Sequence, residues 1–137
     1  MISASVLAYV PQNDPSFSFD TVSLFAMFDD DQFTGRARET AHRFGLNDTS
    51  LSGTAINELS GGERKKLFLS VAEALGSEWM LLDEPSNNLD AHGIEVLEEM
   101  TKRKTGVILV SHNNVFRQCI SERINIENGG VKNEKNT

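Results

Sequence analysis

The stretch Leu59-Ser60-Gly61-Gly62-Glu63 decides how this chain is organised. Ser60 followed three residues later by Glu63 fits a capping box, which predicts that a helix begins directly after Ser60. The two glycines at the first helical positions have no side chains, so a ligand can approach the backbone N–H groups there. Those free N–H groups and the positive end of the helix dipole together make an anion site.

The helix predicted after Ser60 has an apolar stripe and a stop signal. Its apolar positions are Leu67, Phe68, Val71, Ala72 and Leu75. Their recurrence at intervals of three and four residues is typical of an amphipathic helix. Gly76 is the expected C-terminal stop.

A short apolar run that ends in acidic residues follows this helix. Trp79–Leu82 is unbroken and apolar, as expected for a parallel strand that is buried on both faces. Asp83 and Glu84 come next, and Pro85 prevents regular pairing from continuing. Acids at the carboxyl end of a parallel strand stand where open α/β sheets bind ligands, so one could hold a cation while the other polarises a water. The alternative is a solvated acidic loop after a core strand.

Two further strands are predicted from β-branched and apolar runs. Val6–Val10 is stopped by Pro11 and followed by Gln12, and Val107–Val110 delivers Ser111 and His112 to its carboxyl end. Parallel strands would bring His112 to the same sheet edge as Asp83 and Glu84. A histidine in such a place is a structural hydrogen-bonding residue about as often as a functional one. The shared edge with Asp83 and Glu84 favours a catalytic role here.

The rest of the chain predicts mainly helices and loops. The expected elements are a helix over Thr21–Phe28, a helix over Arg36–Phe44 stopped by Gly45, a polar connector from Leu46 to Glu58, a helix capped by Asp90 and running to about Lys104, a short helix over Asn114–Ile120, a hairpin over Arg123–Val131 and a disordered tail over 132–137. Arg36, Arg38 and Arg43 are expected to be solvated, and His42 and His92 to lie at the surface. The phenylalanines between Ser16 and Asp31 would either mark an interaction surface or pack a local core.

Composition limits the possible classes of function. The chain has 137 residues, 39% of them hydrophobic, and a net charge of −7, typical of one soluble globular domain. The negative charge argues against a nucleic-acid face, which needs clustered Lys and Arg. No apolar run approaches the ~20 residues of a membrane span, and no signal peptide is visible behind Met1. Cys119 is the only cysteine, so we expect no internal disulfide and a reducing cytoplasm.

Five motifs in order and spacing resemble those of the ABC ATPase family. Leu59–Glu63 resembles its signature motif, Met80–Glu84 its Walker B strand with the catalytic glutamate, Ser86–Asp90 its D-loop, Ser111-His112 its switch-histidine motif and Tyr9–Gln12 its Q-loop. The resemblance is specific for the family and not for what a member moves.

The resemblance implies a role for each matching residue in a head-to-tail pair of ATPase domains with ATP between them. Ser60, Gly61, Gly62 and Glu63 would clasp the γ-phosphate bound to the opposite phosphate loop, and Asp90 would link the two sites. Asp83 and Gln12 would help to hold Mg²⁺. Glu84 would be the general base on the attacking water, and His112 would contact the γ-phosphate; Gln12 would touch both metal and water.

The sequence contains no G-x-x-x-x-G-K-[ST] run, the loop that cradles phosphates in this family. The resemblance therefore covers about the carboxyl-terminal two thirds of one ATPase domain. We expect a partial P-loop NTPase of α/β class, truncated or split, with a parallel-sheet core remnant (1–12 and 76–131) and a helical signature subdomain (13–75), together an incomplete domain over 1–131. By family topology the absent strand lies beside Val107–Val110, which would become an apolar sheet edge. Alone, the chain should bind ATP weakly and hydrolyse it negligibly.

The implied function is that of an ATP-hydrolysing subunit of an ABC transporter, or a fragment of one. Its expected partners are a second ABC ATPase domain, a transmembrane domain and the portion that carries the phosphate loop, with no nucleic acid. The expected location is the cytoplasmic face of the cell membrane. Two alternatives remain: a non-transport ABC protein of the twin-domain translation-factor type, and a catalytically incomplete partner that supplies only the signature half-site. The roughly forty-six residues from 13 to 58 leave no room for the long coiled coil of chromosome-type members.

Overall fold

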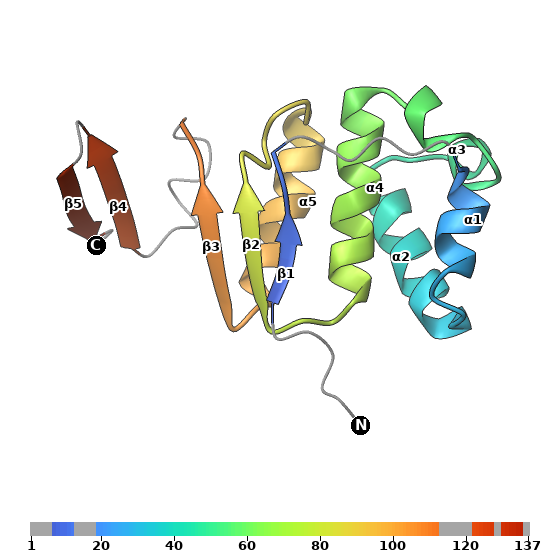
Figure 1. The fold of residues 1–137 in the computed structure, drawn as a ribbon, viewed down its shortest axis with the longest axis horizontal. Coiled ribbons are helices and arrows are strands. Elements are labelled where there is room, and N and C mark those ends of the chain that lie inside the picture. The colour runs from blue at the N-terminus through green and yellow to red at the C-terminus, as the bar shows by residue number, and fades with distance from the viewer. Residues whose placement is uncertain (1–6, 13–18, 113–121, 128–129, 136–137) are drawn as a thin grey trace.

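A computed structural model describes residues 7–12, 19–112, 122–127 and 130–135 (Figure 1). In chain order the elements are β1 (Leu7–Val10), α1 (Thr21–Ala26), α2 (Asp31–Arg43), α3 (Asp48–Leu51), the 3₁₀ turn η1 (Ile56–Glu58), α4 (Gly61–Ala74), β2 (Trp79–Asp83), α5 (Ala91–Lys102), β3 (Gly106–Val110), β4 (Glu122–Glu127) and β5 (Gly130–Lys135). The predicted α/β class is confirmed. No helix in this described part of the chain is both long and apolar enough to cross a bilayer.

Three parallel strands form the sheet that positions the site, in the order β1-β2-β3. Tyr9 pairs with Leu81, which in turn pairs with Ile108, so the register is continuous across all three strands. Strands with parallel direction and matched register end together. The residues that follow β1, β2 and β3 therefore leave the sheet at one edge, as the sequence predicts.

One face of this sheet packs against helices. Its strand residues lie in a common core with side chains of α4 and α5 and with the residue after α2 (Figure 1). The buried members are Ala8, Val10, Phe44, Leu69, Ala72, Met80, Leu82, Val96, Leu97 and Met100. Alternation along each strand places every second side chain here.

The opposite face of the sheet is exposed among the described residues. Its exposed large apolar side chains are Leu7, Tyr9, Trp79, Ile108 and Val110. Trp79 is 40% exposed and Ile108 is 53% exposed. The expectation that Trp79–Leu82 and Val107–Val110 are buried on both faces is therefore wrong, because both described covering helices lie on one side. Among the described residues, β3 also has no neighbouring strand on its outer side, as expected.

Helix α4 lies between the sheet and a second core built from α1, α2 and the loops around α3. Leu69 and Ala72 pack into the sheet core, whereas Leu67 and Ala74 pack into the helical core. The sequence predicted one apolar stripe on this helix, but α4 is buried on two sides and therefore has two apolar faces. Gly76 has φ +67° and follows the end of α4, which confirms the predicted stop.

The phenylalanines of the amino-terminal half mostly pack their own core. Phe25 and Phe33 are each 4% exposed, and Phe28 stacks on Phe33 with ring centroids 4.1 Å apart. For Phe25 the local-core alternative is confirmed, whereas Phe28 is 37% exposed. Exposed apolar side chains remain on α1 and just after it, at Val22 and Met27.

Several predicted boundaries need correction. Helix α2 begins at Asp31 rather than Arg36, because the Asp30 carboxylate accepts hydrogen bonds from the backbone N–H groups of Gln32 and Phe33. The predicted connector contains α3 and η1. β5 pairs with β4 up to Lys135, so the expected disorder of 132–135 is wrong, while the antiparallel hairpin is confirmed. The predicted helix over Asn114–Ile120, with Cys119, lies outside the described residues.

Two of the arginines predicted to be solvated also connect separate elements; Arg36 is exposed as predicted, and Arg43 is half-buried. Arg36 donates to the carbonyl of Ala74 at the end of α4, at 3.0 Å. Arg43 donates to Glu99 on α5 at 2.7 Å. These hydrogen bonds join α2 to α4 and α5, the two helices that pack on the sheet.

Candidate functional site

The predicted capping box forms at the start of α4. The backbone N–H of Glu63 donates to Ser60 Oγ at 3.1 Å, and the backbone N–H of Ser60 donates to Glu63 Oε1 at 3.1 Å. Glu63 Oε2 also accepts from the hydroxyl of Ser50 at 3.2 Å. These bonds, the one from the Ser60 backbone first, lower the pKa of the Glu63 carboxyl. Glu63 therefore holds the helix start in place, and Ser60 stays exposed.

The two glycines of this helix start lie against the loop that follows β2. A Cβ atom on Gly62 would stand 2.6 Å from the backbone oxygen of Asn88, closer than such atoms approach in proteins. A Cβ on Gly61 would meet only the Asn88 side-chain amide, at 3.3 Å. The sequence suggested that both glycines make room for a ligand. At Gly62 the backbone of Asn88 also leaves no room for a side chain.

The acidic end of β2 and the histidine after β3 come together at the sheet edge. His112 Nε2 lies 3.3 Å from Glu84 Oε1. The Glu84 side chain is 4% exposed and that of His112 is 92% exposed, so a buried carboxylate faces an imidazole in water. Glu84 Oε1 accepts no hydrogen bond from any described residue. The predicted juxtaposition of these two residues is present.

The backbone at Glu84 is unusual. It has φ +48°, in the left-handed region that non-glycine residues seldom adopt, and its N–H donates to the carbonyl of Val110 at 2.8 Å. This bond ties the end of β2 to the end of β3. Strained backbone of this kind costs about 1–3 kcal/mol and clusters at functional sites.

The loop after Glu84 leads back to α4. Asp90 caps α5, since its Oδ1 accepts from the backbone N–H of Gly93 at 2.7 Å, and its Oδ2 lies 3.5 Å from Lys66 Nζ on α4. The hydrogen bond from Gly93, then the charge of Lys66, lower the pKa of the Asp90 carboxyl. The predicted N-cap at Asp90 is confirmed.

Sequence reasoning missed Lys65. Its side chain is 0% exposed, and Nζ donates to the backbone oxygens of Pro11 at 3.0 Å and Gln12 at 3.1 Å. The available signal was its spacing from Leu69 and Ala72, four and seven residues on, which places a charge on the sheet-facing side of α4. Gln12 itself is exposed at the end of β1.

The donor groups at this edge fit a phosphate-bound Mg²⁺ better than a metal held by protein alone. No cluster of three or more His, Cys, Asp or Glu side chains occurs among the described residues. Asp83, half-buried, and the amide of Gln12 offer hard oxygen donors. Mg²⁺ prefers such oxygens and usually keeps several waters, with one or two carboxylates and substrate phosphates.

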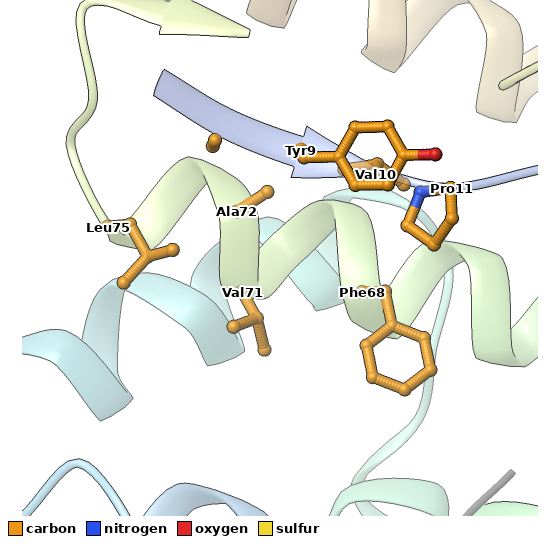
Figure 2. Close-up of a pocket in the computed structure, with 8 residues that line it drawn as sticks. Tyr9, Val10, Pro11, Phe68, Val71, Ala72 and Leu75 are labelled. Atoms are coloured by element: carbon orange, nitrogen blue, oxygen red, sulfur yellow. The ribbon is translucent and has the colours of Figure 1, made fainter. Parts of the chain in front are cut away.

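A groove between β1 and α4 lies beside this edge and has a different character. Figure 2 shows its lining, made by Ala8, Tyr9, Val10, Pro11, Phe68, Val71, Ala72 and Leu75. Apart from the Tyr9 hydroxyl, these side chains are apolar. The groove therefore offers no carboxylate or imidazole, and these groups lie at the strand ends.

Comparison with known proteins agrees with this geometry. The model of the family described as ABC transporter matches residues 2–87, which include the Q-loop, signature and Walker B motifs. The chain belongs to the ABC transporter family. It is 33% identical over 114 residues to "Uncharacterized ABC transporter ATP-binding protein YfmR" of Bacillus subtilis, and 33% identical over 118 residues to "Erythromycin resistance ATP-binding protein MsrA" of Staphylococcus epidermidis.

A solved ABC cassette shares the fold of this family member. The chain superposes with a TM-score of 0.75 and 22% identity on the "Dimeric structure of a post-hydrolysis state of the ATP-binding cassette MJ0796 bound to ADP and Pi". The match covers 94% of this chain and 62% of that one. The match to YfmR covers 82% of this chain but 18% of YfmR, and the match to MsrA covers 85% of this chain but 23% of MsrA. It thus spans a small part of these relatives and about three fifths of a cassette.

Proposed function

We propose that this chain is an ATP-binding and ATP-hydrolysing subunit of an ABC transporter, or part of one, which couples hydrolysis to movement of a substrate across a membrane. One observation carries the hydrolytic part: the buried carboxylate of Glu84 and the imidazole of His112 lie 3.3 Å apart at the edge where three parallel strands end. Membership of the family supports ATP as the nucleotide.

The proposed chemistry assigns a task to each residue at the strand ends. Glu84 accepts a proton from the attacking water, and its burial keeps the carboxylate away from competing solvent. His112 donates from its exposed ring to the γ-phosphate. Asp83 and Gln12 would hold Mg²⁺, which would supply neutralisation of the phosphate charge. Positioning and charge stabilisation supply most of the rate.

The helix start at Ser60 serves the neighbouring active site in this proposal. Ser60 is exposed, and the N–H groups of Gly61 and Gly62 lie at the positive end of α4. Ser60, Gly61 and Gly62 would clasp a γ-phosphate bound to a second ATPase domain, with Glu63 fixing the turn. Asp90 would connect the two sites through its ion pair with Lys66.

Two surfaces fit the proposed partners. The open face of the sheet and the free edge of β3 fit a polypeptide that carries the phosphate loop, whether it lies on a longer form of this chain or on another chain. The exposed Val22 and Met27 of the helical subdomain (13–75) fit a transmembrane partner. Such partners would place the chain at the cytoplasmic face of a membrane, with residues 1–12 and 76–131 forming the catalytic core.

A second candidate is a non-transport ABC protein. MsrA, one of the relatives, has a name that states resistance and ATP binding without transport. In that case the same site would hydrolyse ATP, and no transmembrane partner would exist. A third candidate is a partner that supplies only the signature half-site, for which the exposed Ser60 would suffice.

Complementation tests the proposal. The pure chain should show weak ATP binding and negligible turnover, and addition of a polypeptide with the phosphate-loop strand and helix should produce ATP turnover. The control polypeptide replaces the lysine of that loop by alanine. Turnover by the pure chain that is lost in Glu84→Gln would show that no complementation is needed. No turnover with either polypeptide would favour the third candidate, a partner that supplies only the signature half-site.

A further inference from the structure

A buried lysine lies where α4 passes beside the first strand of the sheet. Lys65 is in the second turn of α4, on the side that carries Leu69 and Ala72 into the sheet core. Its side chain is 0% exposed. An ammonium group in such a place needs hydrogen-bond acceptors, because a buried charge without them is costly.

Its acceptors include two consecutive backbone carbonyls at the carboxyl end of β1. Lys65 Nζ donates to Pro11 O at 3.0 Å and to Gln12 O at 3.1 Å. The pairing of β1 with β2 ends at Val10, so the sheet ladder no longer holds the backbone of these two residues. Hydrogen bonds from a charged donor are roughly twice as strong as neutral ones, and here they take over where the ladder stops.

The neighbouring lysine provides a contrast within the same helix turn. Lys66 points to another loop, with Nζ 3.5 Å from Asp90 Oδ2 at the start of α5. Consecutive lysines thus connect α4 with two different loops of the strand-end edge. Of the two, Lys65 makes the contacts with Pro11 and Gln12.

We propose that Lys65 is a positioning residue for Gln12. It fixes the backbone of Gln12 to α4, so that a displacement of the signature helix is transmitted to Gln12 and from there to the metal and water site. This inference rests on the proposed role of Gln12 in ATP hydrolysis. An uncharged side chain of similar length would fill most of the space, but it would leave both carbonyls without this donor.

The only tyrosine of the chain reports on this segment. Tyr9 lies two residues before Pro11, and both side chains line the same groove (Figure 2). Incorporation of 3-fluorotyrosine into the full chain therefore gives a single ¹⁹F signal close to the proposed contact. The carbonyl ¹³C chemical shifts of Pro11 and Gln12 measure the two hydrogen-bond acceptors directly. The variants are Lys65→Met, Lys65→Arg as the conservative replacement, and Lys66→Met as the matched control.

In Lys65→Met we expect a shifted or broadened ¹⁹F signal and upfield carbonyl ¹³C shifts at Pro11 and Gln12, since each carbonyl loses a charged donor. Lys65→Arg should restore most of both shifts, and Lys66→Met should leave the ¹⁹F signal of Tyr9 unchanged. An unchanged ¹⁹F signal and unchanged carbonyl shifts in Lys65→Met would overturn the proposal. Shifts spread evenly over α2 and α5 would also overturn it, because Lys65 would then support the whole fold.

A measurement on the unaltered chain keeps the proposal testable if Lys65→Met does not fold. Scalar couplings across the hydrogen bonds should connect ¹⁵Nζ of Lys65 with the carbonyl ¹³C atoms of Pro11 and Gln12. Their absence in a resolved spectrum would refute the contact.

The functional readout uses the chain complemented with the phosphate-loop polypeptide. Lys65→Met should lower kcat about tenfold or more and leave KM for ATP unchanged, because misplacement of a positioned group affects the transition state. In a Gln12→Ala background the same substitution should cause no further loss, whereas additive losses would contradict action through Gln12. If the complemented chain shows no turnover at all, the proposed function fails, and the ¹⁹F and coupling data still decide the contact.

Discussion

Replacement of Gly62 by alanine tests the closest approach between the signature helix and the loop after β2. In Gly62→Ala the new methyl group would stand 2.6 Å from the backbone oxygen of Asn88, so α4 or the loop must move by several tenths of an ångström. Gly61→Ala is the matched control. Its methyl group would meet the side-chain amide of Asn88 at 3.3 Å, and that side chain can rotate away.

The two substitutions share one gain and differ in one cost. Alanine is favoured over glycine inside a helix by about 1 kcal/mol, and less at the first turn. Overpacking against a fixed group costs about 1–3 kcal/mol. We therefore expect Gly61→Ala to be neutral or stabilising, and Gly62→Ala to be less stable than Gly61→Ala by about 1–3 kcal/mol.

Urea unfolding followed by far-UV circular dichroism measures this difference, since both variants have the same composition. A second readout is the backbone chemical shift of Asn88, which should move in Gly62→Ala and stay nearly constant in Gly61→Ala. Equal free energies of unfolding for the two variants would refute the reasoning, because the contact with Asn88 would then impose no constraint on Gly62.

Three further predictions concern the capping box and the sheet. The hydrogen bond from the Ser60 backbone N–H lowers the pKa of Glu63, so the stability that this bond adds is complete above about pH 4.3 and is lost as pH falls through the lowered pKa. The urea midpoint of Glu63→Gln should therefore vary less over this pH range than that of the unaltered chain. Equal variation of the two midpoints would contradict this contribution of Glu63. In Gly106→Ala the added Cβ would collide with the Trp79 ring, so the emission of Trp79 should shift to longer wavelength, and an unchanged spectrum would exclude this packing. Ile108→Lys, at a position 53% exposed on the open face, should reduce binding of an apolar dye and change stability by less than about 0.5 kcal/mol; a larger loss would mean that the face is covered.

Much of the site could be predicted because it depends on short-range rules. The capping box of Ser60 and Glu63, the stop at Gly76 and the N-cap at Asp90 each follow from residues within one helical turn. The meeting of Glu84 and His112 follows from two parallel strands that end in register. These features are encoded locally or by strand direction, so the sequence pattern was sufficient.

The features that sequence missed depend on contacts between distant segments. Lys65 finds its carbonyl acceptors 53 and 54 residues away, so its spacing from Leu69 and Ala72 indicates the buried side of α4 but not the groups that it contacts. The helix start at Asp31 is an exception: its cap at Asp30 is local, but the apolar pattern indicated a helix only from Arg36. The open face of the sheet could not be predicted either, because an apolar strand such as Trp79–Leu82 does not reveal how many of its faces are covered.

The most direct measurement is ATP turnover by the complemented chain with Glu84 intact and with Glu84→Gln. If Glu84 is the general base, the variant should retain ATP binding and lose turnover by at least about a hundredfold. The neutral amide keeps the shape of the side chain but cannot accept the proton from water. Turnover that remains within a few fold of the unaltered chain would contradict a hydrolytic site at the ends of these strands.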